Sequence, residues 1–473
     1  FSMHFFILSS AILLIFFCLF LFSIRNIIID WKILAFAVIT TLLFKIPIFI
    51  EPFFGLEYED SYIFSVVARQ YANNHFTDSY FTESIVLGSI ENPVLYGTYS
   101  GHYILFSVFC SWAIKIFGYS PYILSWINTF ITFLILIVLS DFGNQLKLNK
   151  NQWWIIPSIF IISPVINVFG STQLSETFSS FMIVSLVYFV ILFLNKQDYI
   201  SWISVVICFI LTILTKRENN IIILGIVSLL IYDLLKTKRY SLNKTNLLYI
   251  TIVITFIIAN LLLPVLPESI VVESNEIGTS AFSLQYFGKI FPTFMKSLFS
   301  FRYFIVTGVL LLIAIIYNSI YRAPTIVYLS IILLIGYLTL YSIHYRSYYF
   351  IHYNSISEFD TFRYLNNIYP FMAIVIGYSL SKILINSKLW NWSVIMLIVI
   401  VASLSLYYTH TLRHDYSAEE HRLRFKDPIK IIEIFSEENN EKDFVIFSSD
   451  ALIFQIFGAK DLYIGDILHV NSA

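Results

Sequence analysis

Long apolar runs alternate with shorter polar segments along most of this chain. A helix needs about 20 mostly apolar residues to cross a bilayer, because lipid offers the backbone no hydrogen-bond partner. The shorter run 101–117 carries Lys115 and is followed by Gly118, so we expect it to lie in the interface or to re-enter. The remaining runs predict about twelve spanning helices, at 4–24, 33–50, 121–140, 153–170, 177–194, 199–215, 219–235, 247–266, 299–320, 324–343, 364–381 and 390–408.

The composition supports a membrane protein. Of the 473 residues, 58% are hydrophobic and only 12% are charged, whereas a soluble domain carries about 25% charged residues. The mean hydropathy is +0.78. This balance excludes a soluble globular protein and a disordered chain, and the net charge of -1 gives no basic surface for nucleic acid. Three cysteines, all within apolar runs, exclude a disulfide framework.

The charges in the connecting segments predict an orientation. Alternate loops are short and basic, and the positive-inside rule places them in the cytoplasm. They hold Arg25, Lys32, Lys147, Lys150, Lys196, 236–239, Lys244, Arg322, Lys382 and Lys388. The opposite set is longer and more acidic, and we expect it outside together with both termini. It comprises 51–120, 171–176, 267–298, 344–363 and 409–473.

These patterns predict an all-α polytopic membrane protein with external juxtamembrane helices and a small α/β appendage. The membrane domain is expected at 1–408, with its first external loop at 51–120. The appendage is expected at 409–473. Within it the pattern predicts helices over 429–438 and 451–457 and strands at 444–448 and 462–464.

Adjacent carboxylates follow the second predicted span. Glu59 and Asp60 lie directly before an amphipathic segment whose polar side carries Arg69. Two neighbouring acids suit general-base work on a hydroxyl, or metal binding. The structural alternative is a solvated helix start, where acids interact favourably with the helix dipole.

Further polar clusters fall on the same predicted side. Glu176 begins a span, while Lys216 and Arg217 lie between two apolar runs. Each has a structural alternative, since acids favour helix N-termini and long cations reach towards headgroups. Together they predict one face that suits an anionic lipid phosphate and a base. The other candidates for this face are Tyr345, Arg346 and Arg363.

The order of these motifs resembles that of the membrane glycosyltransferases of the C-type fold, which include protein O-mannosyltransferases, aminoarabinose transferases and arabinofuranosyltransferases. The resemblance covers roughly 51–385. It rests on Glu59-Asp60 with Ala68-Arg69, His102 through Lys115-Ile-Phe-Gly118, Ser163-Pro164 through Glu176, Leu214-Thr-Lys-Arg-Glu218, and Arg363-Tyr-Leu through Pro370. The chain departs from the family where Tyr103-Ile104 replaces a Pro-Pro pair, and an extra span precedes the acidic loop.

The resemblance implies transfer of a sugar from a polyprenyl-phosphate donor to a glycan, lipid or protein acceptor outside the membrane. It implies that Asp60 is the base and that Glu59 positions the acceptor or a divalent cation (magnesium, manganese or zinc). It assigns the donor phosphate to Lys216, Arg217 and Arg363, and less strongly to Tyr345 and Arg346. The acceptor or metal candidates are His102, Glu176 and Arg69.

Two other functions stay open. The chain has no Gly-rich phosphate loop, and the segments predicted to lie outside the membrane contain no Asp-x-Asp. This favours a lipid-linked sugar donor over a nucleotide-linked one. A polysaccharide polymerase or ligase using lipid-diphosphate glycans is one alternative. A non-catalytic lipid transporter or assembly subunit is the other.

Residue usage rich in Ile, Lys, Asn, Phe and Tyr favours a bacterial cytoplasmic membrane, with the site facing the periplasm.

Overall fold

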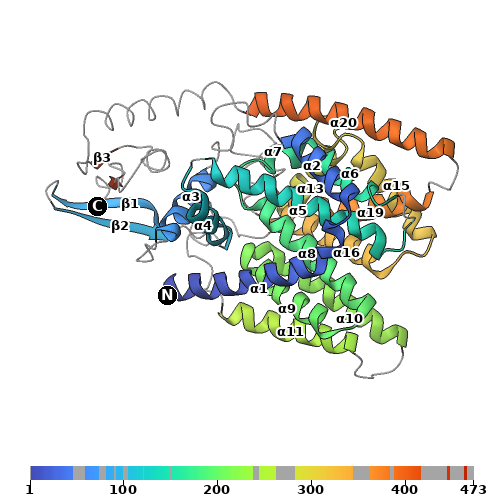
Figure 1. Cartoon of the computed structure of the whole chain (residues 1–473), viewed down its shortest axis with the longest axis horizontal. Helices are drawn as coiled ribbons and strands as arrows, with labels where there is room; N and C mark the ends of the chain where they lie inside the picture. The colour runs from blue at the N-terminus through green and yellow to red at the C-terminus, as the bar shows by residue number, and fades with distance from the viewer. Residues whose placement is uncertain are drawn as a thin grey trace.

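The protein is a bundle of helices with short strands at one end (Figure 1). A computed structural model describes residues 2–45, 59–73, 81–89, 92–99, 105–120, 122–148, 152–237, 244–262, 283–344, 363–383, 388–416, 445–447 and 463–465.

Every predicted span contains helix. Among the described residues, five helices are long and apolar enough to cross a membrane, namely Phe6–Arg25, Ile123–Gln145, Glu176–Lys196, Thr325–Ile343 and Ile395–Leu412. The number of crossings itself stays a prediction. The helices in the predicted spans are α1 (Ser2–Ile28), α2 (Trp31–Lys45), α5 (Ile123–Gln145), α6 (Ile155–Ile161), α7 (Pro164–Phe169), α8 (Glu176–Lys196), α9 (Tyr199–Thr215), α10 (Ile222–Thr237), α11 (Lys244–Leu262), α14 (Phe301–Phe304), α15 (Thr307–Ile320), α16 (Thr325–Ile343), α19 (Tyr369–Ile383) and α20 (Lys388–Tyr416).

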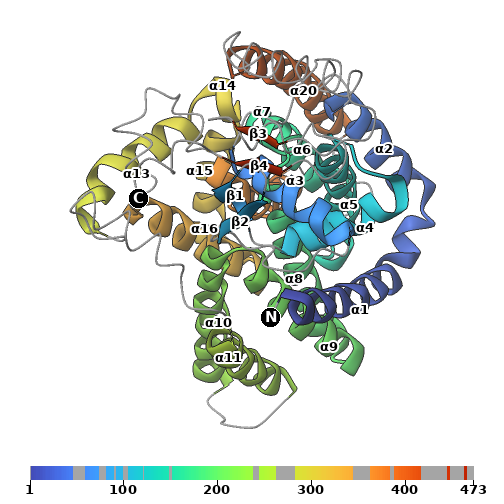
Figure 2. The same cartoon turned by 90° about the vertical axis from the view of Figure 1, so that its left-hand side faces the viewer.

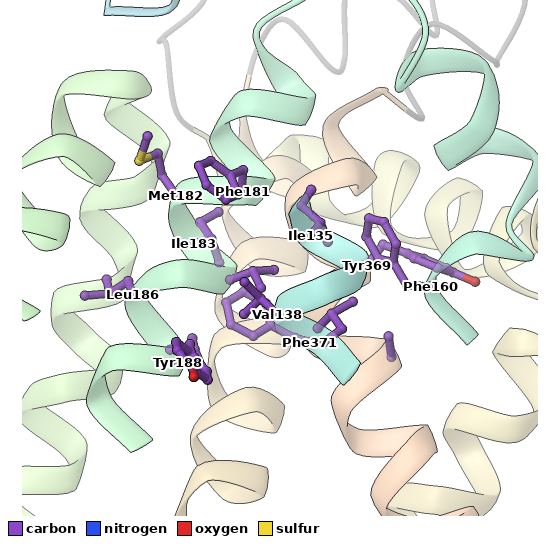
Figure 3. Packing of buried hydrophobic residues seen from close by; sticks show 14 of the residues in the cluster. Ile135, Val138, Phe160, Phe181, Met182, Ile183, Leu186, Tyr188, Tyr369 and Phe371 are labelled. Atoms are coloured by element: carbon purple, nitrogen blue, oxygen red, sulfur yellow. The ribbon is translucent and has the colours of Figure 1, made fainter. Parts of the chain in front are cut away.

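Helix α8 forms the centre of the bundle. It is apolar on all sides, and its residues from Glu176 to Phe193 are buried, as expected for a helix surrounded by others. The outer helices α1, α2 and α15 instead expose large apolar side chains, as a lipid-facing surface requires. Figure 3 shows the core where α5, α6, α8 and α19 meet, with Ile135, Val138, Phe160, Phe181, Ile183, Tyr188, Tyr369 and Phe371.

The predicted span 153–170 is broken into two short helices. Ser163 caps α7, accepting a hydrogen bond from the Ile166 backbone, and Pro164 occupies the first turn. The loop 170–175 that follows is buried throughout, so its backbone groups need partners inside the protein.

Two polar side chains hold this region. Lys45, fully buried at the end of α2, donates to the carbonyls of Ile166 (3.2 Å) and Asn167 (3.0 Å). Asn128 of α5 donates to the carbonyls of Thr172 (2.7 Å) and Leu174 (2.8 Å). The end of α2 and the first half of α5 therefore meet at the same end of the bundle.

The segment that connects α2 to α5 therefore begins and ends at the same end of the bundle. It contains α3 (Glu59–Ala72) and α4 (Leu105–Phe117). At 1.5 Å per residue the 13 residues of α4 extend about 20 Å, less than the hydrocarbon core of about 30 Å. Helix α4 packs against α3 and α1, and its interfacial or re-entrant placement stays a prediction.

The predicted first external loop contains a hairpin that was not predicted. Strands β1 (Phe81–Ser89) and β2 (Asn92–Tyr99) pair antiparallel, with Ser89 opposite Asn92. The runs 85–87 and 94–96 are β-branched, leucine and aromatic residues, which favour strands. The hairpin lies between α3 and α4, the two helices of this loop. A further helix outside the predicted spans, α13 (Leu284–Leu298), buries Tyr286, Ile290 and Phe294 at helical spacing.

Two of the predicted tail elements are present as strands. β3 (Val445–Phe447) and β4 (Tyr463–Gly465) pair in parallel, and β4 lies near β1. Figure 2 looks onto this end and shows the strands and α3 in front of the bundle. The tail helices at 429–438 and 451–457 lie outside the described residues. Helix α20 continues to Tyr416, past the predicted boundary at 408, and the division into two domains stays a prediction.

Three of the predicted basic loops lie together. Asn195, near the end of α8, donates to Gln145 at the end of α5 (3.1 Å), and Lys244 at the start of α11 donates to the carbonyl of Gln197 (3.3 Å). The ends of α5 and α8 and the start of α11 therefore meet, at the opposite end of α8 from Glu176, while the side of the membrane on which they lie stays a prediction.

Gly170 is the residue whose replacement tests the Lys45 contact. A Cβ at this position would lie 2.5 Å from the Ile166 carbonyl oxygen and 2.5 Å from Lys45 Nζ. Gly170→Ala should therefore displace the ammonium and destabilise the fold by about 1–3 kcal/mol, seen as a lower thermal unfolding midpoint in detergent. Gly288→Ala is the matched control, because no atom lies within 4 Å of its Cβ position. Equal midpoints for the two variants would contradict the packing described.

Candidate functional site

A buried ion pair marks the polar end of α8. Lys216, which follows α9, donates to Glu176 Oε1 at 2.8 Å, and the two side chains are 12% and 4% exposed. Glu176 is held in place because the buried loop before it is fixed by Lys45 and Asn128. The second carboxylate oxygen, Oε2, has no hydrogen-bond partner within the part of the chain that the structure describes. The structure therefore brings together one predicted acid and one predicted cation.

The turn that follows Lys216 is fixed to three helices by one asparagine. The 3-10 helix η3 (Arg217–Ile221) begins with the second predicted cation. Asn219, fully buried, donates to the Ser179 hydroxyl of α8 (3.0 Å) and to the Thr212 carbonyl of α9 (2.9 Å). It accepts a hydrogen bond from the Tyr337 hydroxyl of α16 at 2.7 Å. The backbone position of Arg217 is thereby set.

A second turn is attached in the same way. The 3-10 helix η4 (Arg363–Asn367) begins with Arg363 and leads into α19. The Ser180 hydroxyl of α8 donates to the Asn366 carbonyl (2.9 Å), and Asn367 donates to the Tyr341 hydroxyl of α16 (3.1 Å). Both predicted arginine-bearing turns therefore lie against the start of α8.

The acidic pair lies on a helix that is linked to this region through α4. Glu59 and Asp60 are the first two residues of α3. Farther along α3, the Phe64 carbonyl accepts a hydrogen bond from Ser107 of α4 (3.0 Å). The rings of Phe64 and Phe106 are 5.6 Å apart, and Phe106 lies 5.7 Å from Phe178, two residues after Glu176. One aromatic side chain therefore separates α3 from the start of α8.

Arg69 lies away from the acidic pair. It is nine residues after Asp60 on α3, about 14 Å along the helix axis. Its guanidinium lies over the Tyr119 ring, 4.9 Å from the centroid, and the Tyr119 and Ser65 hydroxyls are 3.3 Å apart. Burial raises the pKa of Tyr119, although the Ser65 hydrogen bond and the Arg69 charge act in the opposite direction. These contacts give Arg69 a packing role at the junction of α3 with the segment after α4.

Several predicted site residues lie beyond what the structure describes. His102, Tyr345 and Arg346 lie outside the described residues. Described His, Cys, Asp and Glu side chains form no group of three or more that suits a metal ion. The divalent cation expected near Glu59 thus stays a prediction, and no chemical step below depends on it. For four of the predicted site residues the structure describes the backbone position alone: Glu59, Asp60, Arg217 and Arg363.

Sequence reasoning missed the neutral residues of the site. Tyr337 and Tyr341 belong to no predicted motif, while Asn219 and Asn367 lie in or beside the predicted motifs but received no role. The available signal was their spacing: Asn-Asn pairs at 219–220 and 366–367 lie shortly after an arginine, and Tyr337 and Tyr341 occupy one helix face.

Comparisons with solved structures identify the fold. ArnT from Cupriavidus metallidurans, crystallised bound to undecaprenyl phosphate, matches with a TM-score of 0.57 over 91% of this chain and 85% of its own, at 10% identity. The chain has the C-type fold of membrane glycosyltransferases. Other C-type neighbours come from Archaeoglobus fulgidus. An apo oligosaccharyltransferase matches with a TM-score of 0.56 at 12% identity over 93% of this chain and 64% of its own.

The Archaeoglobus fulgidus oligosaccharyltransferase AglB, in complex with an inhibitory peptide and a dolichol-phosphate, matches with a TM-score of 0.55 at 12% identity. The match covers 90% of this chain and 63% of AglB, so the chain spans less than two thirds of the length of either oligosaccharyltransferase. No protein-family model and no curated protein sequence matches the chain. The identification of the C-type fold therefore rests on three-dimensional structure.

The ion pair predicts unequal effects of removing its partners. Lys216→Met leaves the Glu176 carboxylate buried without its cation, whereas Glu176→Gln leaves a lysine that retains some exposure. Lys216→Met should therefore lower the free energy of unfolding by about 1–3 kcal/mol, more than Glu176→Gln does. Thermal unfolding at neutral pH in detergent measures the stability of both variants. The double variant should lose less stability than the sum of the two single losses. Strict additivity would contradict a direct interaction.

Proposed function

We propose that this protein is an inverting glycosyltransferase that moves a sugar from a polyprenyl-phosphate donor to an acceptor hydroxyl outside the membrane. The observation that carries the proposal is the convergence of Lys216, η3 and η4 on the start of α8, at the same end as the acidic pair of α3. Two neighbours of the same fold were crystallised with undecaprenyl phosphate and with a dolichol-phosphate.

The proposed step needs a base and a stabilised leaving group. The Asp60 carboxylate takes the proton from the acceptor hydroxyl as its oxygen attacks the anomeric carbon. The new glycosidic bond forms on the face opposite the phosphate, the bond from sugar carbon to phosphate oxygen breaks, and the anomeric configuration inverts. Glu59 positions the acceptor.

Negative charge develops on the departing lipid phosphate. Lys216, Arg217 and Arg363 stabilise this charge, and their effect is large because the region is partly shielded from water. Glu176 holds the Lys216 ammonium in one orientation at 2.8 Å and balances its charge while the donor site is empty. Tyr345 and Arg346 are weaker candidates for the same phosphate.

The acceptor is a glycan, a lipid or a protein. Its hydroxyl reaches the site from the aqueous side, where α3 and the hairpin lie (Figure 2). We place the protein in a bacterial cytoplasmic membrane with this end facing the periplasm. Three of the basic loops support that orientation, since those next to the ends of α5 and α8 and the start of α11 lie together at the other end of α8 from Glu176.

Asp60→Asn tests the proposed base. The amide keeps the size of the side chain but takes no proton, so transfer should fall by about 10²–10⁴-fold while the protein stays folded. The measurement is transfer from synthetic polyprenyl-phosphate sugars by purified protein. Glu57→Gln is the matched control, an acid of the same segment with no assigned role, and it should keep its activity. Near-normal turnover by Asp60→Asn would overturn the assignment.

A further inference from the structure

The two arginine-bearing turns are attached to the bundle by matching sets of residues. Each is a 3-10 helix of five residues that begins with arginine and contains an Asn-Asn pair. Each has one hydrogen bond to a serine of α8, through the adjacent residues Ser179 and Ser180. Each also has one hydrogen bond to a tyrosine of α16. The two tyrosines, Tyr337 and Tyr341, are four residues apart in sequence.

The tyrosines form the shared support. Tyr337 and Tyr341 are separated by one helical turn and therefore lie on one face of α16. Their rings stack with centroids 6.0 Å apart and planes at 28°. The Tyr337 hydroxyl donates to Asn219 at 2.7 Å, and the Tyr341 hydroxyl accepts from Asn367 at 3.1 Å. A displacement of either turn therefore acts on the same aromatic pair.

Burial makes these hydrogen bonds effective constraints. Asn219 and Asn367 are fully buried, and so is Tyr337, while Tyr341 is 2% exposed. In such surroundings a lost partner is not replaced by bulk water, so each bond strongly favours one arrangement of its turn. The backbone positions at which Arg217 and Arg363 emerge are thus fixed relative to each other and to Lys216.

We infer that Tyr337 and Tyr341 are positioning residues that hold η3 and η4 as a two-armed clamp for the phosphate group of the donor lipid. The inference rests on the proposed function, because it assigns the two turns to the same phosphate. The tyrosines do not touch substrate. They act by keeping the two turns at a fixed separation, which removes the free-energy cost of ordering them when the donor binds.

The test uses single hydroxyl deletions in the full-length protein. Tyr337→Phe and Tyr341→Phe each keep the buried ring and remove one hydrogen bond. Each variant should weaken donor binding by about three- to tenfold, seen as a raised KM for the donor and a raised Kd for undecaprenyl phosphate, with kcat within about twofold. Because the two turns share one support, the change in donor KM and Kd of the double variant should differ from the product of the two single changes.

Tyr188→Phe is the matched control for stability. Its hydroxyl is also buried on an inner helix and donates to Asp141 Oδ2 at 3.0 Å. Tyr188 lies 12 residues after Glu176 on α8, about 18 Å along the helix axis. This variant should lower the unfolding midpoint as the other two do, but leave KM and Kd unchanged.

The possible failures are distinguishable. If the wild-type protein neither transfers from nor binds any polyprenyl phosphate, the proposed function fails. If the wild type is active but the donor KM and the Kd of Tyr337→Phe and Tyr341→Phe equal those of the wild type, the clamp fails alone. A change in KM for Tyr188→Phe as large as that for the α16 variants would also overturn it, since loss of stability would then explain the effect.

Discussion

The fixing of the buried loop 170–175 is the constraint on which the rest of the polar end depends. Irregular backbone within a lipid-embedded bundle is stable only where protein groups satisfy its hydrogen bonds. Asn128 of α5 supplies two of those bonds, to the carbonyls of Thr172 and Leu174, and Lys45 of α2 holds the end of α7 directly before the loop. The loop in turn fixes the start of α8, where Glu176, Ser179 and Ser180 hold the turns that carry the cations.

The cost of placing charge in lipid explains why the charged residues are few and lie at helix ends. Spanning segments lose stability with each charge exposed to lipid, so ionisable side chains collect where helices begin or end. Lys45 is an exception in the predicted spans, and its partners are two carbonyls near the end of α7, where the span is broken. The Ile166 carbonyl also accepts from the Gly170 backbone, and the Asn167 carbonyl from the Ser171 hydroxyl, so the lysine adds to bonds that this short helix already has.

Much of the helical frame was predictable because lipid imposes long apolar runs, and the start of α8 was predicted at Glu176. The pairing of Glu176 with Lys216 was not, since it joins residues 40 apart in sequence. The hairpin at 81–99 was missed because it lies in a polar loop where no span was expected. The roles of Asn219 and Tyr337 were also missed, because neutral side chains gain significance only from contacts between helices.

The central claim is that the polar end of the bundle receives a lipid-linked phosphate. The most direct test is equilibrium binding of undecaprenyl phosphate and of undecaprenol to the purified protein in detergent. The two lipids differ only in the phosphate group. The account predicts that the phosphate form binds at least about tenfold more tightly, as expected for one or more charge-assisted hydrogen bonds. Equal affinity for the two lipids would contradict it.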